Sequence, residues 1–482
     1  MSRKKVDSRP SDRASGRKDK AASPPSQPPL QEAGRRKFIL MGVGALAATG
    51  VGLAAAYNAG WFDSDPAPAG SPAASAGKGL PPATLAANAE NARRAVDEML
   101  EYYARDLGNA SVLIHAVRGF GRNFALADGR NAVDHLLGLY AAEKEVNGKR
   151  CVYFKREAEV HENSFLKTFL EAGVGMDRAF SIGGNRYTLR DAAEGAKALF
   201  RFDPKDIYRY DADEFRYDPT PLPVRRGPNG EPVSLRGELV HEHLPWGLIA
   251  FSMLMPPGQS SWTNAYGEKL DLSAVLDRGL AEYESTCLLT RDALRQGQRE
   301  TEAFRQEIKK YSCFGLHSVY GFLAGLRHGY KNNGLEGRLR EVMDLVTFRL
   351  KGDAEMIDQE YAAANSQPLP PQMIATLARF GLNQAQVAEA LRLRAQIKMF
   401  GHAFEAINYA RLHKLFIFTP EQERRIQAGE AAFHETAVKM RALNIGGLRQ
   451  WDAKIVSDIV IALGHAARAL KLLNSGNPDV VA

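Results

Sequence analysis

Helical periodicity is the feature that most constrains the fold of this chain. Apolar residues recur at three- and four-residue intervals, as with Ala92, Val96, Met99 and Tyr103 in the range 88–107. This spacing places them on one face of an α-helix, with the intervening charged residues on the other. Similar patterns predict helices over the ranges 300–311, 335–350, 371–415, 420–443 and 448–473. We therefore expect a mainly α-helical protein, with its helical domain over residues 84–475.

Two other kinds of segment interrupt the helical pattern. Short alternating runs at residues 149–153 and 185–189 are the best strand candidates. Residues 202–237 are rich in proline and predict a long connection. A loop of that length in a compact domain is usually functional or mobile.

Two similar stretches indicate an internal repeat of helical hairpins. Val-His-Glu occurs at residues 160–162 and again at residues 240–242, and each copy opens an apolar, helix-like run. Each run is followed, at nearly the same offset, by a turn into a second helix. Hairpins that stack side by side bury apolar faces that no hairpin buries alone. Six such hairpins can be counted between residues 85 and 473.

This six-hairpin pattern resembles the α/α-toroid families, which include glycan-processing enzymes, terpenoid cyclases and protein prenyltransferases. The resemblance lies in helix spacing and in the turn that leads into each second helix. It implies a closed ring of helical hairpins, with an open helical bundle or solenoid as the alternative. The chain has no aspartate-rich motif and no Gln-Trp repeat, which argues against terpenoid cyclisation.

A paired arginine precedes an uncharged run near the start of the chain, within residues 34–60. Arg35, Arg36 and Phe38 match the bacterial twin-arginine export signal, which this segment resembles, while Gly34 and Leu40 depart from it. The resemblance implies transfer by the export machinery to the periplasm or the cell exterior.

The same segment has a second interpretation. Residues 38–57 carry no charge, and about 20 apolar residues suffice for a helix to span a bilayer. If the segment is not cleaved, the protein is anchored in the inner membrane, with its basic tail in the cytoplasm. Both interpretations place the helical domain outside the cytoplasm.

The distribution of charge argues against nucleic-acid binding. The formal net charge is +7, from 63 Lys and Arg and 56 Asp and Glu. Residues 1–40 hold 11 of the basic and four of the acidic residues, so 52 of each remain in the rest of the chain. The helical domain therefore lacks the overall basic excess that binding to a phosphate backbone requires. We expect residues 1–33 to be a disordered basic tail and residues 61–83 to be a Pro/Ala/Gly/Ser linker.

His241 and His243 flank Glu242 just before Pro245, a residue favoured in the first turn of a helix. Alternating histidines can share a divalent metal ion, and this placement also suits general acid–base roles. A helix cap with solvated side chains is the alternative interpretation.

His402 and Glu405 are one turn apart, and Tyr409 and His413 continue the same polar stripe on an otherwise apolar helix. A His-x-x-Glu pair can bind a metal or provide an imidazole that a carboxylate orients. His402 and Glu405 are therefore candidate catalytic residues, together with His241 and His243. A hydrogen-bonded stripe between two helices is the alternative.

Cys313 and His317 are four residues apart on an expected helix, which is half of a zinc site or a thiol–imidazole pair. They join His241 and His243 as candidate metal ligands. Burial of the cysteine as a small apolar residue is the alternative. With Cys151 and Cys287, the chain has three cysteines, so one disulfide or three free thiols are both open.

Trp246, Trp262 and Tyr266 lie beside polar loop residues and are candidate sugar-stacking positions, although they suit an ordinary core as well. The expected function is hydrolase- or lyase-type processing of an envelope or extracellular glycan, which makes a polysaccharide the expected partner. A non-catalytic binding or scaffold protein is the alternative. An enzyme should place at least three of the histidines around one open cavity, and His161 and His465 are candidates for this as well. Burial of the histidines in separate, closed contacts would argue against an enzyme.

Overall fold

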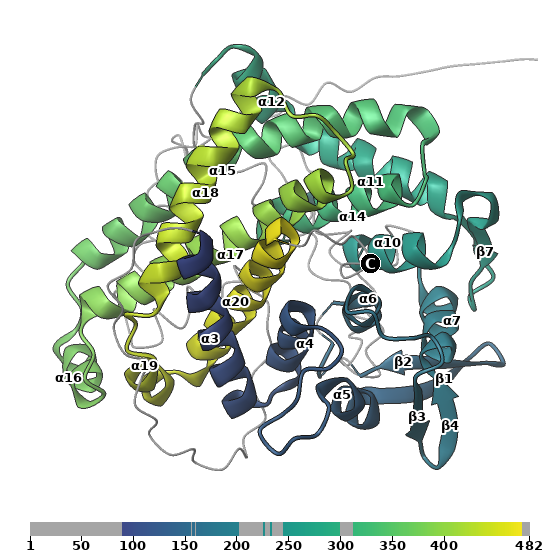
Figure 1. The fold of residues 1–482 in the computed structure, drawn as a ribbon, viewed down its shortest axis with the longest axis horizontal. Coiled ribbons are helices and arrows are strands. Elements are labelled where there is room, and N and C mark those ends of the chain that lie inside the picture. The colour runs from purple at the N-terminus through teal and green to yellow at the C-terminus, as the bar shows by residue number, and fades with distance from the viewer. Residues whose placement is uncertain are drawn as a thin grey trace, which may run out of the picture.

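The computed structural model describes residues 89–201 apart from 156 and 160, the short pieces 225–226 and 232–233, and the ranges 244–298 and 312–474. Within these ranges the protein is mainly helical, as the periodicity predicts (Figure 1). The predicted tail, export signal and linker lie outside the described residues. So do most of the long connection, the predicted helix at 300–311, His241 and His243.

The α-helices in chain order are α3 (Ala89–Leu107), α4 (Ala110–Phe120), α5 (Ala132–Tyr140), α6 (Ser164–Glu171), α7 (Leu189–Leu199), α10 (Leu244–Leu254), α11 (Leu272–Thr286), α12 (Leu288–Arg295), α14 (Leu316–Arg327), α15 (Leu335–Ser366), α16 (Pro371–Arg379), α17 (Gln384–Leu412), α18 (Pro420–Met440), α19 (Ile445–Trp451) and α20 (Ala453–Asn474). Short 3₁₀ turns are η3 (Pro257–Gln259), η4 (Ser312–Gly315) and η5 (Asn332–Gly334).

The described strands form four antiparallel pairs, each of two strands. They are β1 (Ala141–Val146) with β2 (Lys149–Phe154), β3 (Ala179–Ile182) with β4 (Asn185–Thr188), β5 (Arg225–Arg226) with β6 (Pro232–Val233), and β7 (Ser261–Thr263) with β8 (Lys269–Asp271). Both predicted strands are confirmed, as β2 and β4. Their partners were missed because their polar residues hide the alternation.

Two of the continuous helical patterns are broken in the structure. The range 371–415 holds α16 and α17, which are separated where Gly381 takes a positive φ of 65° and Asn383 caps the second helix. The range 448–473 contains the end of α19 and most of α20, which Asp452 separates in an extended conformation. Capping chemistry, rather than loss of apolar spacing, therefore ends these helices.

Six helices pack on one another in a closed series of contacts. In order, α4 packs on α6, α6 on α10, α10 on α14, α14 on α17, α17 on α20, and α20 on α4. The remaining long helices α3, α15 and α18 pack on the outer side of α17 and α20 and on each other. Figure 1 shows α3, near the start of the described chain, lying beside α20 at its end. The first and last of the described helices are therefore neighbours.

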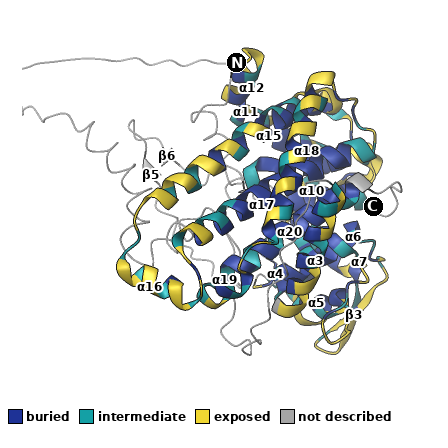
Figure 2. Ribbon diagram, turned by 60° about the vertical axis from the view of Figure 1, so that its left-hand side comes forward, coloured by how far each residue is buried: buried dark blue, intermediate teal, exposed yellow. Residues whose placement is uncertain are grey.

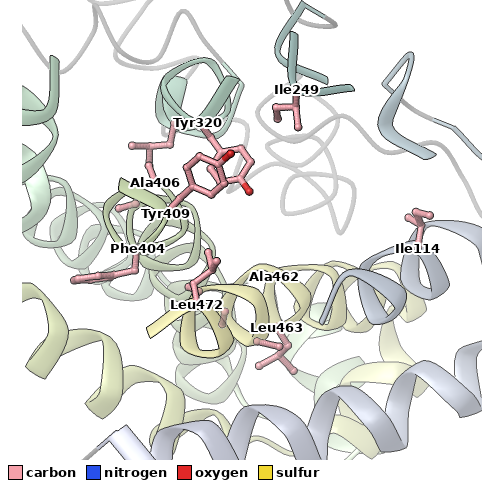
Figure 3. Packing of buried hydrophobic residues seen from close by; sticks show 14 of the residues in the cluster. Ile114, Ile249, Tyr320, Phe404, Ala406, Tyr409, Ala462, Leu463 and Leu472 are labelled. Carbon is pink, nitrogen blue, oxygen red and sulfur yellow. The ribbon is translucent and has the colours of Figure 1, made fainter. Parts of the chain in front are cut away.

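Helix α17 is the central element of the core. It is buried almost continuously from Val387 to Ala410, whereas α16 and the end of α15 are largely exposed (Figure 2). The rings of Tyr320 on α14 and Tyr409 on α17 lie 4.8 Å apart between these two helices (Figure 3). A helix buried on all sides has no polar face to show to water. The buried polar residues on α17, such as His402, Glu405 and Asn408, therefore face other protein groups.

Among the described helices, none is both long and apolar enough to cross a membrane. The uncharged segment at residues 38–57 lies outside the described residues.

Two glycines allow the central helices to approach closely. A Cβ atom on Gly401 of α17 would lie 3.0 Å from the backbone nitrogen of Ala466 on α20. A Cβ atom on Gly464 of α20 would lie 2.6 Å from Cβ of His115 on α4. Both distances are shorter than a normal contact, so larger residues would separate the helices. Each glycine immediately precedes a buried histidine, and the close crossings bring those histidines into the same space.

We expect Gly464→Ala to destabilise the protein by about 1–3 kcal/mol, because the methyl group overpacks the crossing of α4 and α20. The matched control is Gly337→Ala on α15, where a Cβ atom would have no neighbour within 4 Å and the helix propensity of alanine stabilises. Urea unfolding of the full-length protein measures both. Equal effects of the two substitutions would contradict the close crossing.

Candidate functional site

A cavity of about 80 Å³ lies where the six packed helices converge. Each of these helices contributes to its wall. The contributions include His115 and Arg118 from α4, Lys167 from α6, Trp246 from α10, His317 from α14, Lys398 from α17 and His465 from α20. Residues more than 340 positions apart in the chain therefore meet at one place.

The histidines gather around this cavity. His161, His317 and His465 line it. His402 packs beside them, with its ring centroid 4.2 Å from that of His317 and 3.7 Å from that of His465. Four of the histidines that the sequence singles out are thus brought together, whereas His241 and His243 lie outside the described residues.

Cys313 enters the site on an unusual turn. Cys313 and Phe314 both have left-handed backbones, with φ of 52° and 60°, and Gly315 follows with φ of 72°. Left-handed conformations cost a non-glycine residue roughly 1–2 kcal/mol each. Buried Arg349 supports the turn, because its Nη1 donates to the carbonyl oxygen of Phe314 at 3.3 Å. This turn places the thiol at the start of α14, on the cavity wall.

Two overlapping groups of side chains have the composition of a metal site. Cys313, His317 and His402 offer ligand atoms that all lie within 4.8 Å of one another, and so do His402, Glu405 and His465. Thiolate and imidazole together are ligands that zinc and other transition metals prefer.

Arg118 distinguishes the two groups. Its Nη1 atom lies 2.6 Å from Nδ1 of His465 and 2.6 Å from a carboxylate oxygen of Glu405. An arginine only donates, so Nδ1 of His465, which also lies 3.2 Å from the second Glu405 oxygen, accepts from Arg118 and leaves only Nε2 of His465 as a possible metal ligand. The other Glu405 oxygen lies 3.5 Å from Nδ1 of His402. Glu405 can thus orient His402, whose Nε2 remains available to bind a metal ion.

His402 is the most informative residue of the cluster. Its side chain is 1% exposed, and neither ring nitrogen has a hydrogen bond of normal geometry to the described residues. Buried polar groups are almost always paired, so such a group calls for a partner such as an ion. Although burial opposes it, the neighbouring Cys313 thiol and Glu405 carboxylate raise the pKa of His402.

The protonation states of the other ligand candidates suit metal binding. Burial, followed by the charge of His402, lowers the pKa values of His317 and His465 well below the ordinary range, so both imidazoles are neutral. Burial alone would raise the pKa of Cys313, but Lys398 and His402 outweigh it and lower the pKa to about 6. Neutral imidazole and thiolate are the forms that bind metals.

A network of buried, charged side chains adjoins the histidine cluster. Arg118 Nε donates to Glu171 at 3.0 Å, and Lys167 Nζ lies 2.8 Å from the same carboxylate. Arg468 lies 3.8 Å from the second oxygen of Glu171. Despite burial, these three cations lower the pKa of Glu171 to about 2. Burial, and then the charge of Arg118, lowers the pKa of Lys167 to about 7.

The other predicted residues lie in different places. Trp246 is buried at the cavity, stacked on His161 with centroids 4.1 Å apart. Trp262 instead packs with Phe200 and Phe251 and donates to the carbonyl oxygen of Lys197. Tyr266 lines a second cavity of about 230 Å³ between β2, α6 and α7. The structure therefore brings one of the three aromatic candidates to the histidine cluster.

Further along the stripe on α17, Tyr409 is buried against Tyr320, while His413 follows the end of the helix and accepts from Arg327 at 2.8 Å. Cys151, Cys287 and Cys313 are all free thiols. The pairing left open by the sequence is thus resolved in favour of three thiols.

Sequence reasoning missed the charged residues of the site. Arg118, Lys167 and Glu171 lie on α4 and α6, in apolar helical runs where a charge is unexpected. A charged residue on the apolar face of a helix is the one signal that could have found them.

Comparisons with protein-family models, with curated proteins and with solved structures found no match for this chain.

Proposed function

We propose that this protein is an exported or membrane-tethered metalloenzyme, of hydrolase or lyase type, that acts on an envelope or extracellular glycan. Its centre is one transition-metal ion, zinc in the first instance, held by Cys313, His317 and His402. The imidazole of His402, buried beside a thiol and a second imidazole and without a hydrogen bond of normal geometry to the described residues, carries the proposal.

We propose further that the six packed helices are the inner ring of an α/α toroid. The closed series of contacts supports this arrangement, because the first and last members of an open solenoid would not meet. The cavity supports it as well, since all six helices contribute to its wall. In this arrangement the metal lies near the axis of the ring.

The ligand geometry favours a catalytic site over a structural one. Catalytic zinc sites use three protein ligands and keep one position open, whereas structural sites are closed by four. Bond lengths of about 2.0 Å to nitrogen and 2.3 Å to sulfur bring tetrahedral ligand atoms to about 3.5 Å from each other. The three ligand atoms, which lie within 4.8 Å of one another, therefore need to approach each other by no more than about 1.3 Å. Cys313 and His317 line the cavity, so the open position faces it.

The surrounding residues have clear roles in this proposal. Glu405 orients His402 through Nδ1, as carboxylates commonly do for metal-bound histidines. His115 lies at the cavity with Nδ1 directed at the carbonyl oxygen of Ser111, 2.6 Å away, so its Nε2 is free of a proton. Burial lowers the pKa of His115 to about 3, which keeps it neutral. A neutral imidazole beside the open position is placed to accept a proton from a bound water.

Cleavage of a polymer tests the enzymatic function. Full-length protein loaded with zinc is incubated with isolated envelope glycan and a panel of soluble polysaccharides, and new reducing ends or unsaturated ends are measured. We expect cleavage that a chelator abolishes and added zinc restores. Binding of a glycan without cleavage, in either metal state, would favour the non-catalytic scaffold.

A second candidate function rests on the spatial arrangement of Cys313, His402 and Glu405, in which the imidazole lies beside both the thiol and the carboxylate. A thiol, an imidazole and a carboxylate in this order form the nucleophile, base and orienting group of cysteine-based acyl transfer. The lowered pKa of Cys313 favours it. Bound zinc would block alkylation of Cys313 in the metalloenzyme. In a thiol enzyme, alkylation would instead abolish activity that needs no metal.

A further inference from the structure

We propose that the second cavity, of about 230 Å³, binds one non-acidic sugar ring through Tyr153, Tyr266 and Asn163. This inference names a binding site outside the histidine cluster. It rests on the proposed function only for the source of the sugar, which is one residue of the glycan. The binding itself needs no metal, because none of the candidate metal ligands among the described residues lines this cavity.

The size of the second cavity selects a ring-sized ligand. Its volume of about 230 Å³ exceeds the roughly 150 Å³ of a cavity that binds benzene. It is smaller than the roughly 300–1,000 Å³ of sites that hold drug-sized molecules. The wall comes from β1, β2, the turn before α6, α6 itself, α7 and the turn between β7 and β8. A single six-membered ring with small substituents therefore has the right size.

Asn163 presents an unused amide group to this cavity. The residue is 8% exposed and lines the wall, yet its side chain neither caps α6 nor makes another hydrogen bond to the described residues. Asparagine directly before a helix normally caps it. Here the backbone is left-handed, with φ of 67°, and Glu159 instead accepts from the backbone nitrogen of Phe165, 2.8 Å away in the first turn of α6. A buried amide without a partner calls for a ligand group that both donates and accepts, as a hydroxyl does.

Two tyrosine rings line the same cavity. Lys144 Nζ lies 4.9 Å from the ring centroid of Tyr153, and the guanidinium carbon of Arg201 lies 4.5 Å from that of Tyr266. Arg201 is itself paired with Glu268 at 2.6 Å. Each cation covers one face of its ring, so a ligand would stack on the other face. A tyrosine has an apolar body and a polar edge, which match the apolar face and the hydroxyl edge of a sugar ring.

Hydrogen bonds to the backbone fix the position of Tyr266. The N–H of Ala265 donates to the carbonyl oxygen of Ala198 at 2.7 Å, and Nδ2 of Asn147 donates to the carbonyl oxygen of Ala265 at 2.9 Å. The N–H of Tyr266 donates to Oδ1 of Asn264 at 2.9 Å. The turn that carries Tyr266 is therefore held to α7 and to the turn between β1 and β2. A ring positioned in advance lowers the entropic cost of binding.

The charges at the wall argue against an acidic sugar. Lys144, Glu159 and Glu162 are the charged residues among the described lining. One ammonium group and two carboxylates give the wall no net positive charge, so a ligand carboxylate would be repelled. Carboxylate oxygens also accept hydrogen bonds from hydroxyl groups. The ligand class is therefore a hydroxyl-bearing ring without an acidic group.

The second cavity and the histidine cluster share one wall segment, residues 158–168. Glu159, Asn163 and Leu166 line the second cavity. His161, Phe165 and Lys167 line the cavity at the histidines. The two cavities therefore lie on different sides of α6 and the turn before it. A sugar in the second cavity leaves the histidine cluster unoccupied.

Titration calorimetry of metal-depleted, full-length protein tests the inference. The ligands are glucose, galactose, mannose and N-acetylglucosamine, with glucuronate, open-chain sorbitol and cyclohexylamine as comparisons. We expect at least one of the neutral sugars to bind one to one, with a dissociation constant on the order of 1 mM for a ligand of this size. Glucuronate and sorbitol should bind at least tenfold more weakly. Absence of saturable binding by any neutral sugar, or tighter binding of cyclohexylamine, would overturn the inference.

Three variants assign the binding to this cavity. Asn163→Gly removes the amide and tolerates the left-handed backbone, whereas Tyr266→Leu removes a stacking ring. Each should weaken binding about tenfold. Ala196→Leu fills the cavity from α7 and should abolish binding without lowering the midpoint of urea unfolding. Sugar binding that survives all three substitutions would overturn the inference.

Matched controls carry the same substitutions at exposed positions outside the cavity. Asn333→Gly replaces another left-handed asparagine, with φ of 49°, and Tyr102→Leu replaces a tyrosine that is 45% exposed. Both controls should bind sugar as the wild type does. If they lose as much affinity as Asn163→Gly and Tyr266→Leu, the sugar is bound elsewhere.

The sugar site and the metalloenzyme can fail separately. If metal-depleted protein binds a sugar but zinc-loaded protein cleaves no polymer, the metalloenzyme is refuted and the sugar site stands. If zinc-loaded protein cleaves a polymer but the wild type binds none of the neutral sugars, the sugar site is refuted and the metal centre is untouched.

Discussion

Replacing Cys313 by serine is expected to lower the affinity of the full-length protein for zinc by at least 100-fold. The substitution is close to isosteric but removes the thiolate, which the structure places with His317 and His402 in one group of ligand atoms. Loss of a partner that only orients a ligand already weakens metal binding by about 10–100-fold, and loss of a ligand weakens it further. Competition with a chromophoric chelator measures the affinity.

Four further variants complete the series. His402→Ala should match Cys313→Ser, and Glu405→Gln should cost about 10–100-fold, because Glu405 acts through His402. Cys151→Ser and His413→Ala are matched controls, since both residues lie outside the cluster. If the controls weaken zinc binding as much as the cluster variants, the metal is bound elsewhere.

Glu171→Gln is expected to destabilise the protein by about 3–5 kcal/mol at pH 7. Glu171 is the shared partner of Arg118, Lys167 and Arg468, and all four side chains are buried. Removing one member of a buried ion network leaves the opposite charges without compensation, which costs about this much. The midpoint of urea unfolding of the full-length protein measures the loss.

The pH dependence and a surface control sharpen this prediction. The pKa of Glu171 is lowered from its ordinary 4.5 to about 2, so its contribution is complete above about pH 4.5 and is lost as the pH falls towards 2. The part of the difference between wild type and Glu171→Gln that comes from this carboxylate should therefore shrink as the pH falls from about 4.5 towards 2. Glu355→Gln, which removes an exposed pair with Lys351, should stay within about 0.5 kcal/mol at every pH. A similar effect of both variants would contradict the buried network.

The helical class could be predicted from the sequence because apolar spacing is a local property. The prediction failed at helix ends, where single residues such as Asn383 and Asp452 decide whether a helix continues. Partner strands β1 and β3 were missed because each has only one buried residue, Ala141 in β1 and Phe180 in β3. These errors concern boundaries and not the fold class.

The candidate site was found only in part, for a physical reason. Gly401-His402 and Gly464-His465 carried a readable signal, since each glycine permits a close helix crossing beside a histidine. Cys313 and His317 were linked by spacing, although a left-handed turn, rather than the expected helix, holds Cys313. Which charged side chains lie beside His402 depends on how helices that are distant in sequence pack on one another. No local sequence pattern encodes that packing.

X-ray absorption spectroscopy of zinc-loaded, full-length protein tests the central proposal most directly. We expect one zinc ion per chain, with one sulfur ligand at about 2.3 Å and two imidazole nitrogens at about 2.0 Å, completed by one lighter scatterer. Cys313→Ser should remove the sulfur signal, while Cys151→Ser should keep it. Zinc with no sulfur in its first shell, or a sulfur signal that survives Cys313→Ser, would contradict a metal centre built on Cys313, His317 and His402.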